Sequence, residues 1–96
     1  MKIDRDSLEV LHKKDASRFE IQIGEYIAEL DYRLAGNIIT FTHTGVPSEL
    51  EGNGIGSLIA RAGLDYAREQ GFKVVPLCSF VDSYMRRKPE YENLRA

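Results

Sequence analysis

The stretch that decides the fold is residues 51–57, Glu51-Gly52-Asn53-Gly54-Ile55-Gly56-Ser57, in which three alternating glycines precede a helical pattern. A glycine has no Cβ atom, so a ligand can approach the backbone closely there. The first turn of a helix carries N–H groups without intrahelical partners, beside the positive end of the helix dipole. We therefore expect a phosphate or pyrophosphate site in the loop. The predicted donors are the amides of Gly54, Ile55, Gly56 and Ser57, with Gly52 and Asn53 completing the loop.

A plainer interpretation is that the glycines only let the helix enter tightly over a sheet, since a glycine-rich turn alone is weak evidence for a ligand. Two nucleotide motifs do not fit the loop. A mononucleotide P-loop needs a lysine after its last glycine, whereas this chain continues Gly56-Ser57-Leu58. A dinucleotide-binding fold carries an acidic residue at the end of the next strand, and here that strand reads Val74-Val75-Pro76-Leu77.

Upstream of the loop, alternating side chains predict antiparallel strands. Residues 18–23 place Phe19, Ile21 and Ile23 on one face, and residues 26–34 alternate more clearly still. The pairs Gly24-Glu25 and Gly36-Asn37 are typical of turns, so residues 38–44 are expected to form a third strand antiparallel to the second. A further strand is expected around residues 8–12.

Downstream of the loop, the pattern changes to helix, strand and helix. The first helix is expected to end at Gly71, followed by an apolar strand over residues 72–77. Because proline cannot donate a backbone hydrogen bond, Pro76 indicates either that this strand lies at an edge of the sheet or that the residue is near the end of the strand. Ser79 and Asp82 resemble a weak capping box for a second helix. The apolar stripe of the first helix is Ile55, Leu58, Ile59, Ala62 and Tyr66. The predicted fold class is α/β, of the α+β kind.

Composition limits the classes of function. The 96 residues, 43% of them hydrophobic, are enough for one domain spanning residues 1–96. Because the 13 basic and 15 acidic residues are mixed along the chain, nucleic acid is a disfavoured partner. One cysteine and two separated histidines predict neither a disulfide nor a metal site. With no apolar leader and no membrane-spanning segment, we expect a cytoplasmic protein without a membrane partner.

These motifs together resemble the GNAT superfamily of acetyl-CoA-dependent acyltransferases, whose pyrophosphate loop reads Gln/Arg-x-x-Gly-x-Gly/Ala at the start of a helix. Glu51 stands where that pattern has Gln or Arg, which affects a side-chain contact to the pyrophosphate from this position but not the backbone N–H donors of the loop. The resemblance covers about residues 19–91 and is closer to the small stand-alone YjdJ-type branch than to the superfamily as a whole. It is carried by the glycine loop with His43-Thr44-Gly45-Val46-Pro47, Val75-Pro76-Leu77-Cys78 and Pro89-Glu90-Tyr91.

The resemblance implies a GNAT-like bent mixed sheet, in which the third strand and the strand over residues 73–77 are parallel neighbours that splay apart. The pantetheine arm of coenzyme A would lie in that gap, touching main-chain groups of Thr44 and Val46. A main-chain N–H would polarise the acetyl carbonyl. Larger relatives place two helices where this chain has only Gly24-Glu25. The acceptor side is therefore expected to be open, which favours a polyamine, a peptide or protein amine, or a pocket completed by another subunit.

Three side chains are candidates for the chemistry. His43, in strand register with Ile39 and Phe41, has an intrinsic pKa suited to proton transfer, although a hydrogen-bonded core histidine fits equally. Tyr84 could protonate the departing thiolate or could anchor its helix in the core. Cys78 could accept the acetyl group as a thiolate, although a cysteine in an apolar strand is more often a small buried hydrophobe.

Three functions follow from these observations. The first is an acetyl-CoA-dependent N-acetyltransferase that acts by direct transfer or through a Cys78 thioester. The second is a noncatalytic module that binds coenzyme A or docks a peptide. The third is a structural domain without a ligand. The basic run Arg86-Arg87-Lys88 could approach the phosphorylated adenosine end of coenzyme A, but it is expected mainly to offset the dipole at the end of the second helix.

Overall fold

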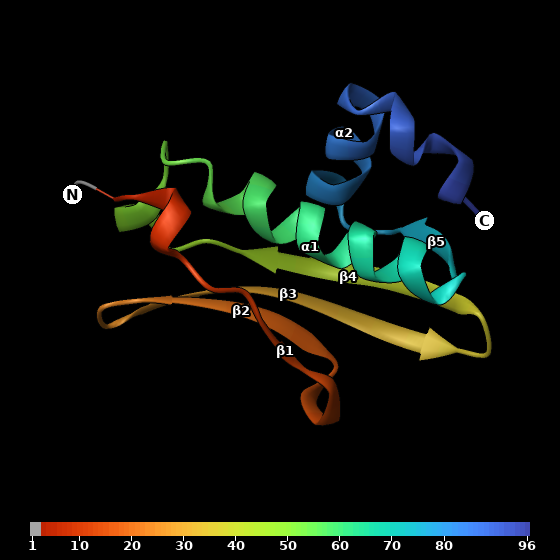
Figure 1. The fold of residues 1–96 in the computed structure, drawn as a ribbon, viewed down its shortest axis with the longest axis horizontal. Coiled ribbons are helices and arrows are strands. Elements are labelled where there is room, and N and C mark those ends of the chain that lie inside the picture. The colour runs from red at the N-terminus through yellow and green to blue at the C-terminus, as the bar shows by residue number, and fades with distance from the viewer. Residues whose placement is uncertain (1–2) are drawn as a thin grey trace.

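Five strands and two α-helices form the fold in a computed structural model, which describes residues 3–96 (Figure 1). The order of strands, helix, strand and helix is the predicted one. The strands are β1 (Leu11–Lys13), β2 (Arg18–Ile23), β3 (Tyr26–Ala35), β4 (Ile38–Gly45) and β5 (Lys73–Pro76). The helices are α1 (Ile55–Gln70) and α2 (Ser79–Arg87), with short 3-10 turns η1 (Arg5–Ser7), η2 (Lys14–Ala16), η3 (Ser48–Leu50) and η4 (Pro89–Leu94).

The strands form one mixed sheet in the order β1-β2-β3-β4-β5. Neighbours from β1 to β4 are antiparallel, whereas β4 and β5 are parallel and pair from Ile38 with Lys73 to Phe41 with Pro76. Beyond Phe41, β4 continues to Gly45 and pairs only with β3. The predicted parallel neighbours are therefore confirmed, and β4 has an unpaired edge where β5 leaves it.

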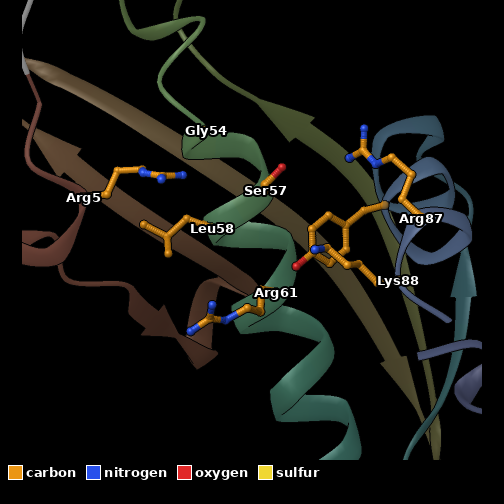
Figure 2. A pocket seen from close by; sticks show the side chains of 8 residues that line it. Arg5, Gly54, Ser57, Leu58, Arg61, Arg87 and Lys88 are labelled. Carbon is orange, nitrogen blue, oxygen red and sulfur yellow. The ribbon is translucent and has the colours of Figure 1, made fainter. Parts of the chain in front are cut away.

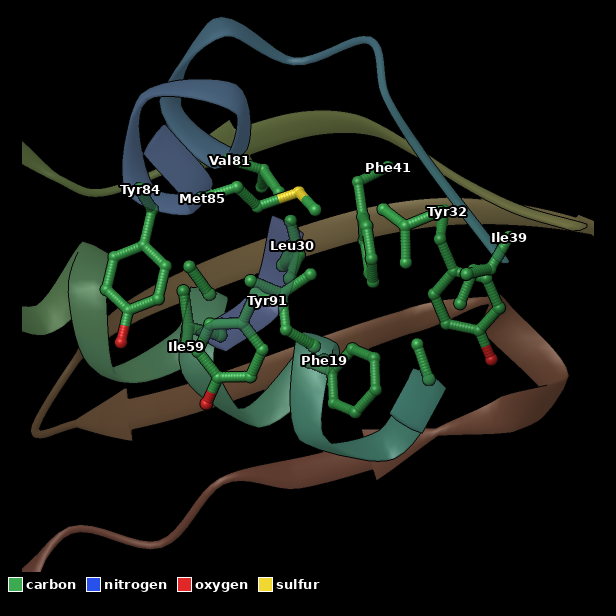
Figure 3. Packing of buried hydrophobic residues seen from close by; sticks show 14 of the residues in the cluster. Phe19, Leu30, Tyr32, Ile39, Phe41, Ile59, Val81, Tyr84, Met85 and Tyr91 are labelled. Carbon is green, nitrogen blue, oxygen red and sulfur yellow. The ribbon is translucent and has the colours of Figure 1, made fainter. Parts of the chain in front are cut away.

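Helix α1 lies directly on the sheet, as Figure 1 shows. The contact is close because of Gly63, where a Cβ atom would lie 2.8 Å from Leu30 Cδ2 and 2.9 Å from Phe41 Cε1. The aromatic and aliphatic side chains beneath the helix form one core with residues of α2 and η4 (Figure 3). This packing determines where the N-terminus of α1 points.

The buried face of α1 is rotated from the predicted stripe. Leu58, Ala62 and Tyr66 are only half-buried, on the flank of the helix. The sequence pattern predicted that large side chains form the buried face of α1, but its small residues make the close contact with the sheet. The buried residues of α1 are Ile55, Gly56, Ile59, Ala60, Gly63, Leu64 and Ala67.

Two predicted boundaries are also corrected. The N-terminal strand begins at Leu11 rather than near residue 8, because only residues 11–13 pair with β2. Cys78, and not Ser79, occupies the N-cap position of α2, and no side chain caps that end. Asp82 does not form a capping box, because its carboxylate pairs with Arg95 at 2.7 Å and with Arg86 at 3.1 Å.

The Pro89-Glu90-Tyr91 segment starts η4, which closes the core beside α1 and α2. The buried Tyr91 hydroxyl donates to Asp65 Oδ1 at 2.7 Å, and its ring lies 6.1 Å from that of Tyr84. Burial, with the Asp65 hydrogen bond, raises the pKa of Tyr91 to about 12. Tyr91 therefore stays a neutral donor that joins η4 to α1 at physiological pH.

An aromatic cluster around His12 joins β1 to the rest of the fold. The imidazole stacks on Phe19 at 4.1 Å and meets the edge of Tyr66 at 4.4 Å between ring centroids. His12 Nε2 lies 2.7 Å from the Tyr32 hydroxyl. Burial lowers the pKa of His12, and the nearby charge of Lys14 lowers it further. The folded protein therefore prefers a neutral imidazole here.

We predict that stability falls with acidification because of His12. Its pKa is lower in the folded protein than the 6.5 of an unfolded chain, so the unfolded state binds this proton more readily. The contribution is fully present above pH 6.5 and is lost as the pH falls through 6.5 towards the lower folded value. Urea unfolding at several pH values should show that His12→Phe flattens this dependence. The exposed His43 provides the control, and a His43→Gln variant that flattened the profile equally would contradict the prediction.

Candidate functional site

The first turn of α1 carries backbone amides that no protein group accepts. Within residues 3–96, the N–H groups of Gly54, Ile55, Gly56 and Ser57 donate to neither a backbone nor a side-chain acceptor. The N-cap residue, Gly54, provides no side-chain cap, and the first turn holds no acidic residue. With 16 residues of helix behind them, these amides are an available site for an anion.

Each glycine of the loop also has a local reason to be glycine. Gly52 and Gly54 have φ angles of 84° and 73°, in the left-handed region that favours glycine. A Cβ atom on Gly56 would lie 2.6 Å from Cζ of the Phe80 ring. Asn53 stabilises the loop by donating to the Leu50 carbonyl at 2.9 Å. The unpaired amides, rather than the glycine content, therefore carry the inference of a ligand.

A groove of about 390 Å³ leads from these amides to the unpaired edge of β4. Thr44 and Val46 form the strand side, and Phe80 from the first turn of α2 forms the opposite wall. The groove therefore joins the predicted pyrophosphate loop to the predicted pantetheine residues. Its complete lining is Thr44, Val46, Leu50, Glu51, Gly52, Gly54, Ile55, Gly56, Ser57 and Phe80.

Cys78 lies where β4 and β5 part. Its backbone N–H donates to the Phe41 carbonyl at 2.9 Å, and its Sγ lies 3.1 Å from Thr44 Oγ1. Burial raises the pKa of this half-buried thiol, but hydrogen bonds from the Thr44 side chain and the first-turn amides of α2 outweigh burial. The pKa of Cys78 is therefore below its ordinary 9.0, which favours the thiolate.

His43 lies on the opposite face of the sheet from the one we predicted. The pairing of β4 with β3 shifts between Asp31 and Tyr32, so Thr42 is an extra residue in β4. Without the bulge, the side chains of Phe41 and His43 would point to the same face of the sheet. With it, His43 is exposed and pairs with Asp31 of β3. His43 belongs to neither of the two cavities beside the glycine loop.

Tyr84 is buried one helical turn beyond Phe80 and contributes to a second cavity, separate from the groove that Thr44 lines. Burial raises the pKa of its hydroxyl, and the Arg87 guanidinium lies 5.9 Å from its ring centroid. The structure thus brings Cys78 together with Thr44 but brings neither Tyr84 nor His43 into that groove.

Two residues beside the loop were not predicted. Phe80 covers Gly56, and Arg5 reaches Gly54 from the N-terminal segment. The apolar residue at the start of the second helix was a signal for Phe80, but only the folded chain shows that its ring faces the glycine loop. No pattern in the sequence indicates Arg5, because its place depends on how residues before β1 return to α1.

Residues 3–96 contain neither a candidate metal cluster nor a candidate membrane-spanning helix. No group of three or more histidine, cysteine or acidic side chains is arranged to hold a metal ion in this part of the chain. None of the helices described there is long and apolar enough to cross a membrane.

Comparison with known proteins agrees with the fold. Residues 18–94 match the model of the GCN5-related N-acetyl-transferase family. Protein NATD1 of Gallus gallus and of Mus musculus are each 28% identical over 85 residues, covering 85% of this chain and 77% of theirs. The solution structure of a GCN5-like protein from Staphylococcus aureus is 31% identical with a TM-score of 0.73, covering 93% of this chain and 88% of the other. The chain therefore belongs to the GCN5-related N-acetyltransferase family.

Proposed function

We propose that this protein binds acetyl-CoA and transfers its acetyl group to an amine. The observation that carries the proposal is the row of unpaired amides from Gly54 to Ser57, at one end of the groove that leads to Thr44. Backbone donors at a helix N-terminus suit the pyrophosphate of coenzyme A. The unpaired edge of β4 beyond Phe41 offers main-chain groups to the amide-containing pantetheine arm. Acetyl-CoA supplies the activated acetyl thioester.

Two routes lead from this site to an acetylated amine. In direct transfer, the neutral amine attacks the acetyl carbonyl and the coenzyme A thiolate leaves. In the covalent route, the Cys78 thiolate displaces coenzyme A first, and the amine then displaces Cys78 from the thioester. The lowered pKa of Cys78 and its position at the N-terminus of α2 support the covalent route.

The acceptor in this proposal is a polyamine or an amine of a peptide or protein. Only the turn at residues 24–25 separates β2 from β3, so no helix at that position encloses the acceptor. An acceptor larger than the groove can approach from outside. We propose a cytoplasmic location and a single domain over residues 1–96 with this activity.

One observation favours the alternative of a noncatalytic module. Cys78 contacts Thr44 at the groove but, like His43 and Tyr84, is not among the residues that line it, so proton transfer from the amine would depend on water or on the acceptor itself. Incubation of the protein with acetyl-CoA and spermidine, amino acids or lysine peptides separates the two functions, with release of free thiol as the readout. Thermal stabilisation by coenzyme A without turnover would support the module and contradict the enzyme.

We predict that the affinity for coenzyme A depends on the absence of a side chain at Gly56. Gly56→Val should weaken coenzyme A binding by about a hundredfold, because the new side chain covers the unpaired amides and displaces Phe80. Phe80→Ala is the matched control, since it alters the same contact from the other side and leaves the amides free. Calorimetry should show that this control keeps most of the affinity. If a folded Gly56→Val protein binds coenzyme A as the wild type does, the site lies elsewhere.

The covalent route predicts an acetyl group on Cys78 when the protein meets acetyl-CoA without an acceptor. Mass spectrometry of the intact protein and its peptides should detect the thioester, and a later amine should remove it. Cys78→Ala should abolish both the adduct and most of the transfer activity. Full transfer by Cys78→Ala would instead establish direct transfer.

The state of the thiol gives a prediction that does not depend on turnover. Thr44→Val removes a hydrogen bond to the Cys78 sulfur, so the pKa of Cys78 should rise. The rate of alkylation by iodoacetamide, measured against pH, should then reach half its maximum at a higher pH than in the wild type. Thr42→Val is the matched control, because Thr42 Oγ1 donates to the Asp31 carbonyl instead. Equal profiles for wild type and Thr44→Val would contradict the assignment.

A further inference from the structure

A second cavity of about 420 Å³ adjoins the groove across the first turn of α1. Gly54 and Ser57 line both cavities, so the second continues from the unpaired amides. Figure 2 shows Arg5 reaching this turn from one side, with Arg87 and Lys88 coming from α2 on the other. Its complete lining is Arg5, Gly54, Ser57, Leu58, Arg61, Tyr84, Arg87 and Lys88.

The charge of this cavity is entirely positive. Four of its lining residues are arginine or lysine and none is acidic, although the chain carries a net charge of -2. Among the described residues, no carboxylate pairs with Arg5, Arg87 or Lys88, and Arg61 meets Asp65 only at 4.0 Å. The cavity is therefore a local excess of cations in a slightly acidic protein.

The position of Arg5 indicates that the excess positive charge of this cavity serves to bind an anion. Arg5 Nη1 lies 2.6 Å from where a Gly54 Cβ would be, so a guanidinium sits at the N-terminus of α1. A cation at the positive end of a helix dipole is unfavourable unless negative charge lies between them. Helix-end compensation explains Arg87 and Lys88 but not Arg5, which belongs to no long helix.

The three basic residues at the end of α2, Arg86, Arg87 and Lys88, differ in what they contact. Arg86 Nε pairs with Asp82 at 3.1 Å and does not line the cavity. Arg87 and Lys88 line the cavity with Arg5 and Arg61. We expected the run Arg86-Arg87-Lys88 mainly to offset the helix dipole. That role does not explain why Arg87 and Lys88 share a cavity with cations from elsewhere in the chain.

We propose that this cavity binds the 3′-phosphate of coenzyme A. The proposal rests on the proposed function, because the pyrophosphate must occupy the amides of Gly54 to Ser57 for the adenosine end to reach the neighbouring cavity. A phosphomonoester carries nearly two negative charges and three acceptor oxygens, which match several converging cations. The protein thereby distinguishes coenzyme A from dephospho-coenzyme A, which is identical in the groove and lacks only this group.

Calorimetric titration with both nucleotides tests the proposal. The wild type should bind coenzyme A about tenfold more tightly than dephospho-coenzyme A, a preference that rising salt reduces. The double variant Arg87→Gln/Lys88→Gln should bind the two nucleotides within about twofold of each other, with its affinity for dephospho-coenzyme A nearly unchanged, because both residues line only the second cavity. That unchanged affinity also shows that the variant is folded. Arg86→Gln is the matched control and should keep the tenfold preference.

The outcomes distinguish this inference from the function on which it rests. Equal affinities of the wild type for the two nucleotides would overturn the phosphate site and leave coenzyme A binding intact. A preference that survives in the double variant, or is lost equally in Arg86→Gln, would also overturn it. Binding of neither nucleotide by the wild type would refute the proposed function together with the inference.

Discussion

Pro76 has no backbone N–H to donate, and the parallel pairing of β4 with β5 ends at this residue. The chain turns after it, with Leu77 N–H bonded to the Val75 carbonyl, and Cys78 N–H makes the last contact with β4 at Phe41. Because β4 continues to Gly45, its outer edge is left unpaired. The groove, the position of Cys78 and the start of α2 all follow from this early end of the ladder.

The two helices bring their N-termini to this gap for different reasons. Helix α1 is held by its contact through Gly63 with Leu30 and Phe41, and no acceptor among residues 3–96 meets the amides of its first turn. Helix α2 starts immediately after the ladder ends, so Cys78 occupies its N-cap. The positive end of α1 therefore favours an anion at the groove, and the positive end of α2 favours a thiolate at Cys78, which lies against Thr44. Phe80, in the first turn of α2, packs against Gly56 in the first turn of α1.

The far face of the sheet has a different character. The bulge at Thr42 turns His43 to this face, opposite Asp31, while Arg18 pairs there with Glu29 and, at 2.9 Å, with Asp31. With α1 and α2 packed on the core side, the groove beside α1 and this polar face are distinct surfaces.

Alternation, turn residues and the glycine loop determined much of this protein from the sequence alone. Residues 18–23, the turn at residues 24–25 and Gly71 at the end of α1 were predicted correctly, because local periodicity and backbone preference dominate there. The parallel neighbours β4 and β5 were expected from the family resemblance and not from any local pattern. Tertiary structure decided the rest. The buried face of α1 depends on how closely Gly63 lets it approach the sheet, and the side of His43 depends on a bulge that shifts the pairing by one residue. Arg5 joins Arg61, Arg87 and Lys88 only because the N-terminal segment returns to α1, and no local pattern can record a contact between residues so far apart in the chain.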